Sequence, residues 1–205
     1  GWVSSSSACA AAGDAPPIER ARLVANPGCY ATAAILALAP LAARGLIAGT
    51  AFVDGKSGVT GAGRRLADRY LFTEVDENVS LYRVVDHQHV PEIELALSRI
   101  GADVRVVFAP HLLPIRRGLI TTCFVPLARA MDDGELVAAL RETYADATVI
   151  EGRPVVDVVA IDTIDVHAVA HRPGAIVGGK VDARSRSAVV ACAIDNLSKG
   201  AASQA

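Results

Sequence analysis

The sequence predicts a single domain of the α+β class, in which helices and strands build one core. Three observations support this prediction. Helical and strand-like stretches alternate along the chain, no internal repeat or low-complexity linker divides it, and hydrophobic residues make up 52% of its 205 residues. A chain of this length and composition can bury a sizeable core. We expect a polar lead-in over residues 1–22, the domain over 23–193, and the start of a truncated carboxyl-terminal helix over 194–205.

The first elements are a helix, a strand and a glycine-rich loop. The helix is predicted over 30–44, because Gly45 can cap its carboxyl end without a side-chain penalty. A strand is predicted over 50–54. The loop "GKSGVTGAGR" follows over 55–64, where its glycines favour an irregular backbone.

The middle of the chain is typical of a helix followed by two strands. Pro91 suits the first turn of a helix that ends near Gly101. The stretches 103–114 and 117–128 are rich in β-branched residues, which favours strands, and a turn at 116–118 separates them.

The last third contains another helix and several strands. The helix is predicted over 132–145, because two aspartates at 132 and 133 suit its amino end and apolar residues recur at i+4 from Leu136. The strands that follow are predicted over 154–163, 165–171 and 175–182. The stretch from 187 onwards is predicted to be a strand that runs into the start of a helix.

Charge and composition exclude several classes of partner. Twenty lysines and arginines nearly balance 22 aspartates and glutamates, and no basic run would follow a phosphate backbone or an anionic membrane surface. Pro40 and Arg44 interrupt the most apolar stretch, so we expect no membrane span. The lead-in lacks the basic start and aliphatic stretch of a secretory signal. We therefore expect neither nucleic acid nor membrane as a partner.

The cysteines are scattered and form no Cys-x-x-Cys pair, which favours a reducing cytoplasm over a disulfide framework. They are Cys9, Cys29, Cys123 and Cys192. Cys123 and Cys192 lie within apolar strand patterns and Cys9 within the lead-in, so we interpret these three as structural or incidental.

Cys29 differs from the others because Asn26, Pro27 and Gly28 form a turn directly before it. This turn places the thiol at the start of a helix, where free backbone N–H groups and the helix dipole would favour the thiolate and lower its pKa. A buried packing cysteine is the alternative, but packing does not require Pro-Gly on the amino side. A nucleophile, however, needs open backbone for a substrate carbonyl to approach.

Two histidines, His87 and His89, stand beside a polar loop and a helix start, where a side chain can act as an acid or base. A zinc pair is the alternative, but no further ligand cluster completes a metal site, so we expect no metal. His111 is interpreted as a strand-end residue that shapes the site. We expect His167 and His171 at surface or strand positions.

The glycine-rich loop could hold a phosphate or could be an ordinary turn-rich loop. Its glycines at 58, 61 and 63 have Gly-x-x-Gly-x-Gly spacing, which fits neither the dinucleotide fingerprint nor the Walker loop. Lys56, Arg64 and Arg117 could bind an anion or could be solvated surface charges.

Five segments in one order resemble the N-acetyl-gamma-glutamyl-phosphate reductase family, whose relatives are aspartate-semialdehyde dehydrogenase and glyceraldehyde-3-phosphate dehydrogenase. The segments are "VANPGCYATAAILALAPL", "DGKSGVTGAGR", "YRVVDHQHVPEI", "PHLLPIRRGLITT" and "AIDNLSKGAA". The resemblance implies a mixed, largely antiparallel sheet with helices on one face, which is the catalytic and dimerisation domain of that fold. It also implies a homo-oligomer of two or four chains.

The resemblance also implies roles for individual residues. Cys29 corresponds to the catalytic nucleophile, and the acid or base comes from the His87–His89 segment, where we choose His89 over His87. Ser57, Gly58 and Asn196 are implied cofactor contacts. The implied substrate-binding residues are Lys56, Arg64 and Arg117.

The implied reaction is reduction of an acyl phosphate to a semialdehyde, in arginine biosynthesis. Cys29 would displace phosphate to give a thioester, and hydride from NADPH would reduce it to a thiohemiacetal that collapses with a proton from His89. NADP is therefore the expected cofactor, and a small acyl phosphate the expected substrate.

The sequence departs from the family in three places. Only 28 residues precede Cys29, too few for a βαβ nucleotide-binding domain, so we expect the catalytic portion of a longer enzyme that is inactive alone. The lead-in lacks the family's Tyr-Gly-Leu-Pro-Glu segment, and Asp162 stands where relatives tend to carry asparagine. Two alternatives are a reductase of carrier-linked aminoadipyl phosphate in lysine biosynthesis and a non-catalytic oligomerisation remnant.

Overall fold

A computed structural model describes residues 25–203 except 65, 148 and 151. The expected lead-in and Cys9 lie outside the described residues. The helices are α1 (Cys29–Ala42), α2 (Phe72–Val75), α3 (His89–Arg99) and α4 (Asp133–Tyr144). The strands are β1 (Thr50–Gly58), β2 (Ser80–Leu81), β3 (Arg105–Leu113), β4 (Leu119–Pro126), β5 (Val149–Ile150), β6 (Arg153–Pro154), β7 (Val156–Val158), β8 (Ala175–Asp182) and β9 (Ser187–Ile194). A π-helical turn, η5 (Ser198–Ala202), follows β9.

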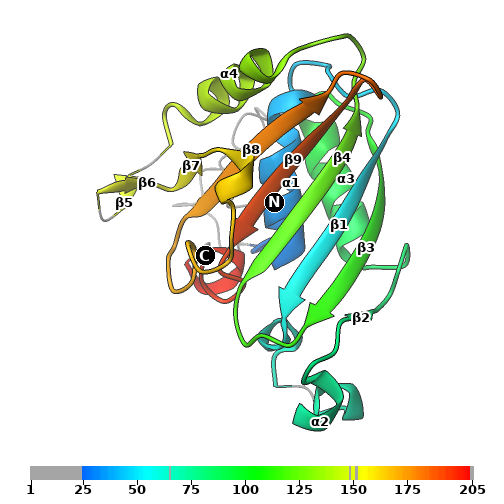
Figure 1. Cartoon of the computed structure of the whole chain (residues 1–205), viewed down its shortest axis with the longest axis vertical. Helices are drawn as coiled ribbons and strands as arrows, with labels where there is room; N and C mark the ends of the chain where they lie inside the picture. Colours follow the sequence, from blue (N-terminus) through cyan, green and yellow to red (C-terminus); the bar gives the residue numbers. More distant parts are fainter. Residues whose placement is uncertain (1–24, 65, 148, 151, 204–205) are drawn as a thin grey trace.

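One mixed sheet organises the described residues, with strand order β2-β3-β1-β4-β9-β8-β7. β1 pairs with β3 and β7 with β8 in parallel, and the other neighbours in this sheet are antiparallel. Figure 1 shows α1 and α3 together behind the sheet, while the near face carries no α-helix and only the short 3-10 turn over Ile161–Thr163 lies in front of β8. The predicted class, with a largely antiparallel sheet and helices on one face, is confirmed.

Helix α1 is the centre of the core. Its residues from Tyr30 to Ala42 are all buried between the sheet, α3 and α4, as expected for a helix that is apolar on every side. Pro40 lacks the N–H that would bond to the carbonyl of Leu36 one turn earlier. The Tyr144 hydroxyl of α4 donates to that carbonyl at 2.5 Å instead, so α4 is tied to α1 where the helix ladder is interrupted.

The two faces of the sheet differ because side chains alternate along each strand. On β1, Ala51, Val53 and Ser57 point toward the helices and are buried. Phe52 points the other way and is 48% exposed. Within the described residues, no helix is both long enough and apolar enough to cross a membrane.

Two strand predictions are wrong. The stretch 165–171 forms turns, because the Asp165 carboxylate accepts the N–H of Ala168 at 2.8 Å and the Ala170 N–H donates to the carbonyl of Val166 at 3.1 Å. The predicted strand over 154–163 is a strand only in β6 and β7, and a 3-10 turn over Ile161–Thr163 contains the exposed Asp162. Local side-chain bonds to the backbone outweigh a strand-like pattern here.

Candidate active site

Cys29 is the first residue of α1, and its turn is held by the neighbouring helix. Gly28 is the extended residue before the helix, and its N–H donates to Oε1 of Glu92 in α3 at 3.0 Å. The Gly28 carbonyl accepts the N–H of Thr32 at 2.8 Å and so begins the helix ladder. Cys29 is partly buried, whereas Cys123 and Cys192 are fully buried in strands.

Two glycines make room for the groups around Cys29. A Cβ added to Gly28 would lie 2.0 Å from Nε2 of His89, so the imidazole lies directly against the Pro-Gly turn. A Cβ added to Gly200 would lie 2.6 Å from the Cβ of Cys29, so η5 closes the site from another side. Figure 1 shows η5 beside the amino end of α1. Any larger residue at 28 or 200 would displace the histidine or the cysteine.

The two histidines lie together but in different environments. Their ring centroids are 4.6 Å apart, and Nδ1 of His87 accepts the backbone N–H of His89 at 3.2 Å. His87 is 8% exposed and makes edge contacts with Tyr30, Tyr82 and Phe108. His87 therefore packs among aromatic rings and holds the start of α3, while His89 contacts the cysteine turn.

Burial decides the protonation states at this site. Burial raises the pKa of the Cys29 thiol to about 11. Hydrogen bonds from the backbone N–H groups of Tyr30 and of Cys29 itself lower this pKa, but burial has the larger effect. The carboxylate of Glu92 raises the thiol pKa further. Burial also lowers the pKa of His89 to about 4, with contributions from His87 and Arg83. Thiol and imidazole are therefore neutral at pH 7, and the expected lowering of the Cys29 pKa by the helix start is wrong for this structure.

The expected cofactor contacts lie at the end of β1. Ser57 and Asn196 are each 2% exposed, and Ser57 Oγ donates to the Gly58 carbonyl at 3.1 Å. Asn196 accepts the Gly118 N–H at 2.8 Å and donates to Thr60 Oγ1 at 3.0 Å. The structure thus brings Ser57, Gly58 and Asn196 together, with their polar groups engaged in holding the glycine-rich loop.

The expected anion-binding residues are dispersed. Lys56 lies on the face of the sheet away from the helices, where it pairs with Asp54 at 2.5 Å. Nη1 of Arg117 lies 3.2 Å from Oδ2 of the fully buried Asp195. Arg64 is exposed on the loop after β1. Among the described residues, no group of three or more histidine, cysteine or acidic side chains is arranged to hold a metal.

Sequence reasoning missed three residues that organise the site. Glu92 follows His89 by three positions, which places both on one side of α3, and this spacing was the available signal. The Tyr30 hydroxyl donates to the carbonyl of His111 at 3.1 Å and ties α1 to β3. The Asp195 carboxylate accepts backbone N–H groups of His171, Leu197 and Ser198 at 2.6, 2.8 and 3.0 Å. An aspartate shortly before a helix start was the local signal for its bonds to Leu197 and Ser198, but no local pattern indicated the bond to His171.

Comparison with known proteins identifies the family. Residues 29–196 match the family described as "Semialdehyde dehydrogenase, dimerisation domain". N-acetyl-gamma-glutamyl-phosphate reductases of Pelotomaculum thermopropionicum and Moorella thermoacetica are 47% and 44% identical over 191 residues. Those matches cover 92% of this chain and 53% and 54% of the relatives, so the chain spans about half the length of the curated relatives it matches.

Solved structures share the fold at lower identity. A probable aspartate-semialdehyde dehydrogenase from Pseudomonas aeruginosa aligns with a TM-score of 0.69 at 18% identity, covering 98% of this chain and 64% of that one. Aspartate semialdehyde dehydrogenase II from Vibrio cholerae complexed with ASA aligns with a TM-score of 0.68 at 16% identity, covering 88% and 59%. The chain belongs to the semialdehyde dehydrogenase family, and its residues 29–196 form the family's dimerisation domain.

Proposed function

We propose that this chain is the catalytic and dimerisation portion of an N-acetyl-gamma-glutamyl-phosphate reductase, which reduces an acyl phosphate to a semialdehyde in arginine biosynthesis. The observation that carries the proposal is the placement of Cys29 at the start of α1, with His89 packed against Gly28 beside it. Relatives at 47% and 44% identity bear that enzyme's name, which supports the choice of substrate. The proposed location is the cytoplasm.

His89 is the proposed acid and base of the reaction. Burial lowers the pKa of His89 to about 4, so its imidazole is neutral at pH 7 and has a nitrogen available for the thiol proton of Cys29. The same lowering makes it a weak base toward the buried thiol, so bound substrate would have to bring the two pKa values closer together. The sulfur then forms a bond to the acyl carbon while the bond from that carbon to the phosphate oxygen breaks. His89 returns its proton to the sulfur when the semialdehyde leaves, so both residues end the turnover as they began.

NADP is the proposed cofactor, and its nicotinamide supplies hydride to the thioester carbon when bound. A Cβ on Gly61 would lie 3.1 Å from Ser57 Oγ and 3.8 Å from Asn196 Nδ2, so this glycine packs directly against both buried side chains. Gly58 and Gly61 would form a backbone wall for the ring, which Ser57 and Asn196 hold in place. The rest of the dinucleotide would be bound by residues outside this chain.

Arg64 is the proposed ligand for the substrate phosphate or carboxylate. It is exposed and follows the glycine-rich loop, whereas Lys56 and Arg117 are engaged by Asp54 and Asp195. Lys56 and Arg117 would therefore contribute by fixing local structure. No specific observation favours a carrier-linked aminoadipyl substrate or a non-catalytic remnant.

The proposed partner is a second copy of this chain, bound through the open face of the sheet. Val107, Phe52 and Phe124 are cross-strand neighbours on β3, β1 and β4 and are 38%, 48% and 45% exposed. Adjacent exposed aromatic side chains mark an interaction surface. The family's dimerisation role supports a like chain as its occupant.

The test joins this chain to the amino-terminal half of the Pelotomaculum relative and follows phosphate-dependent reduction of NADP+ by N-acetyl-glutamate semialdehyde. Activity is expected, with complete loss on Cys29→Ser and near-normal rates for Cys123→Ser as the control. Activity only with a carrier-linked aminoadipate semialdehyde would replace the proposed substrate. An inactive joined protein that binds NADPH normally would support the remnant instead.

A further inference from the structure

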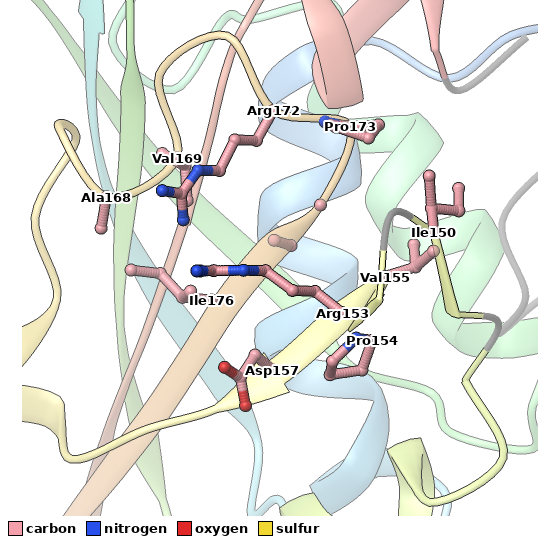
Figure 2. A pocket seen from close by; sticks show the side chains of 12 residues that line it. Ile150, Arg153, Pro154, Val155, Asp157, Ala168, Val169, Arg172, Pro173 and Ile176 are labelled. Carbon is pink, nitrogen blue, oxygen red and sulfur yellow. The ribbon is translucent and has the colours of Figure 1, made fainter.

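A pocket of about 280 Å³ lies at the β7–β8 edge of the sheet. Its walls come from the β5–β6 hairpin, β7, the first residues of β8 and the turn over 168–174 (Figure 2). None of its lining residues belongs to the candidate active site around Cys29. Its volume is just below the usual range of ligand pockets, roughly 300–1,000 Å³, which fits a molecule of amino-acid size.

Three charged side chains line this pocket from three different elements. Figure 2 shows the guanidinium groups of Arg153 and Arg172 extending into the pocket. The carboxylate of Asp157 lies on the side of Arg153 away from Arg172. Among the described residues, none of these side chains forms an ion pair or a hydrogen bond. Both arginines are exposed residues, and an oxyanion placed between their guanidinium groups would accept charge-assisted hydrogen bonds from each.

The backbone that carries Arg172 is fixed before any ligand arrives. His171 has a left-handed φ of 63°, and its N–H donates to Asp195 Oδ2 at 2.6 Å. Nη1 of Arg117 lies 2.6 Å from Nδ1 of the same histidine. The Arg172 N–H donates to the Val169 carbonyl at 3.0 Å. Holding the backbone in this strained turn directs Arg172 and lowers the ordering cost of binding.

The remainder of the pocket is apolar. Val169 and Ala175 are each 2% exposed, and Val155 and Ile176 are partly buried. A carbon chain placed against these side chains loses contact with water, which favours binding. The lining therefore combines two cations for an oxyanion, one carboxylate for a cation, and an apolar wall for an aliphatic group.

We propose that this pocket binds a free aliphatic α-amino acid as its zwitterion. Arg153 and Arg172 bind the carboxylate, Asp157 binds the ammonium group, and the side chain lies against Val169 and Ile176. The proposal does not depend on the activity at Cys29, because no residue is shared between the two sites.

The test is calorimetric titration of the full chain with L-leucine and three matched probes. The probes are 4-methylpentanoate, which lacks the ammonium group, L-leucinamide, which lacks the carboxylate, and inorganic phosphate. Saturable binding of leucine is expected, with each deletion weakening it by about tenfold or more, as for loss of one charge-assisted contact. Arg172→Gln and Arg153→Gln should each weaken leucine binding similarly, and Arg99→Gln on α3 should leave it unchanged.

Asp157→Asn separates this proposal from simple anion binding. It should remove the preference for leucine over 4-methylpentanoate, because only the ammonium group needs the carboxylate. If phosphate bound more tightly than leucine, and if Asp157→Asn did not change the phosphate affinity, the proposal that the ligand is a zwitterion would be wrong. If leucine showed no saturable binding up to about 10 mM, its binding free energy would be smaller than ~3 kcal/mol in magnitude, and the proposed amino-acid site would be wrong. Because Arg153 and Arg172 lie on different elements, the proposal can still be tested if one of the two variants misfolds. Thermal melting of each variant would reveal misfolding.

Discussion

The covered and open faces of one sheet show how burial divides the work of this domain. On the covered face, Cys29 and His89 lie among helices. Burial raises the pKa of Cys29 and lowers that of His89, so it favours the neutral form of each side chain. On the open face, Lys56 pairs with Asp54, and Phe52 and Phe124 remain exposed. The same strand β1 serves both faces through alternate side chains. Chemistry is therefore expected from the covered face and association from the open one, and each prediction below tests that division.

The largest effect is expected from the acid and base on the covered face. In the joined enzyme, His89→Asn should lower kcat by roughly 10²- to 10⁴-fold, the usual range for loss of a general acid or base. His87→Asn should lower it much less, because His87 packs among aromatic rings instead of against the cysteine turn. Steady-state kinetics of both variants provide the comparison. A larger loss for His87→Asn would reverse the assignment.

The second effect concerns the reactivity of Cys29 in this chain alone. With a pKa of about 11, its thiolate fraction at pH 7 should be about 300-fold below that of a model thiol of pKa ~8.5. Alkylation by iodoacetamide, followed by site-resolved mass spectrometry, should be slow at pH 7 and rise with pH up to about 11. It should still exceed that of Cys123 and Cys192, which are fully buried. Rapid labelling at pH 7 would show that the helix start outweighs burial.

The same raised pKa predicts the direction of a stability change. Folded Cys29 keeps its proton at pH values where the unfolded thiol has lost it, so its contribution is complete below about pH 8.5. Stability should then fall as pH rises toward 11. In a stability profile measured by denaturant unfolding, Cys29→Ser should make this fall less steep. The part that remains comes from other buried groups whose pKa is raised, which include Cys123 and Cys192.

The helix ends and the motifs of the candidate site could be predicted from the sequence, whereas the direction of the Cys29 pKa shift could not. The ends of α1, α3 and α4 were predicted to within about three residues, because Gly45, Pro91 and Asp132 are local signals for helix ends, whereas the one-turn helix α2 was not predicted. The cysteine turn and the histidine pair were also readable from local order. The sign of the Cys29 shift was not, because it depends on burial by α3 and η5, which are distant in sequence. The partner role of Asp195 was hidden for the same reason.

The strand errors have a different cause. The stretch 165–171 is rich in valine and alanine, but Asp165 caps a turn and His171 takes a left-handed conformation. The pairing of strands also depends on contacts between residues that are distant in sequence. For example, β4 and β9 are adjacent in the sheet but far apart in the chain. Pattern alone places strands along the sequence but does not place them side by side.

A third prediction tests the close packing of the covered face. Gly28→Ala would put a methyl group 2.0 Å from His89 Nε2, so the imidazole must move. Displacement of about 1 Å costs roughly 10²-fold in rate, which is the loss we expect in kcat/KM. Gly134→Ala in α4 is the control, because its added Cβ would meet only Asp132 Oδ1, at 3.3 Å. Equal rates for Gly28→Ala and Gly134→Ala would mean that His89 is not held against the turn.

A fourth prediction tests the open face. Phe52→Glu together with Phe124→Glu should raise the dissociation constant of the homodimer by about tenfold to 100-fold, because two charges from each copy would be buried between the copies. Sedimentation velocity over a range of protein concentrations measures the change. Leu66→Glu is the control, since Leu66 is 98% exposed and lies on a loop outside the sheet. Cys29 alkylation should be unaffected, and dimers of unchanged affinity would assign the contact to another surface.

The smallest effect comes from a single hydrogen bond on the covered face. Tyr144→Phe removes the hydroxyl that donates to the Leu36 carbonyl, while Pro40 cannot supply the missing N–H. A buried acceptor left without a partner costs about 1–2 kcal/mol, which corresponds to a fall in Tm of roughly 2–8 °C for a domain of this size. Tyr70→Phe, at a partly buried position in the 3-10 turn over Asp68–Tyr70, removes a hydroxyl that forms no hydrogen bond with the described residues and should leave Tm unchanged in the same calorimetric scans. If Tyr144→Phe also left Tm unchanged, water or a local shift of α1 must satisfy Leu36, and the covered face would be less tightly packed than its buried side chains imply.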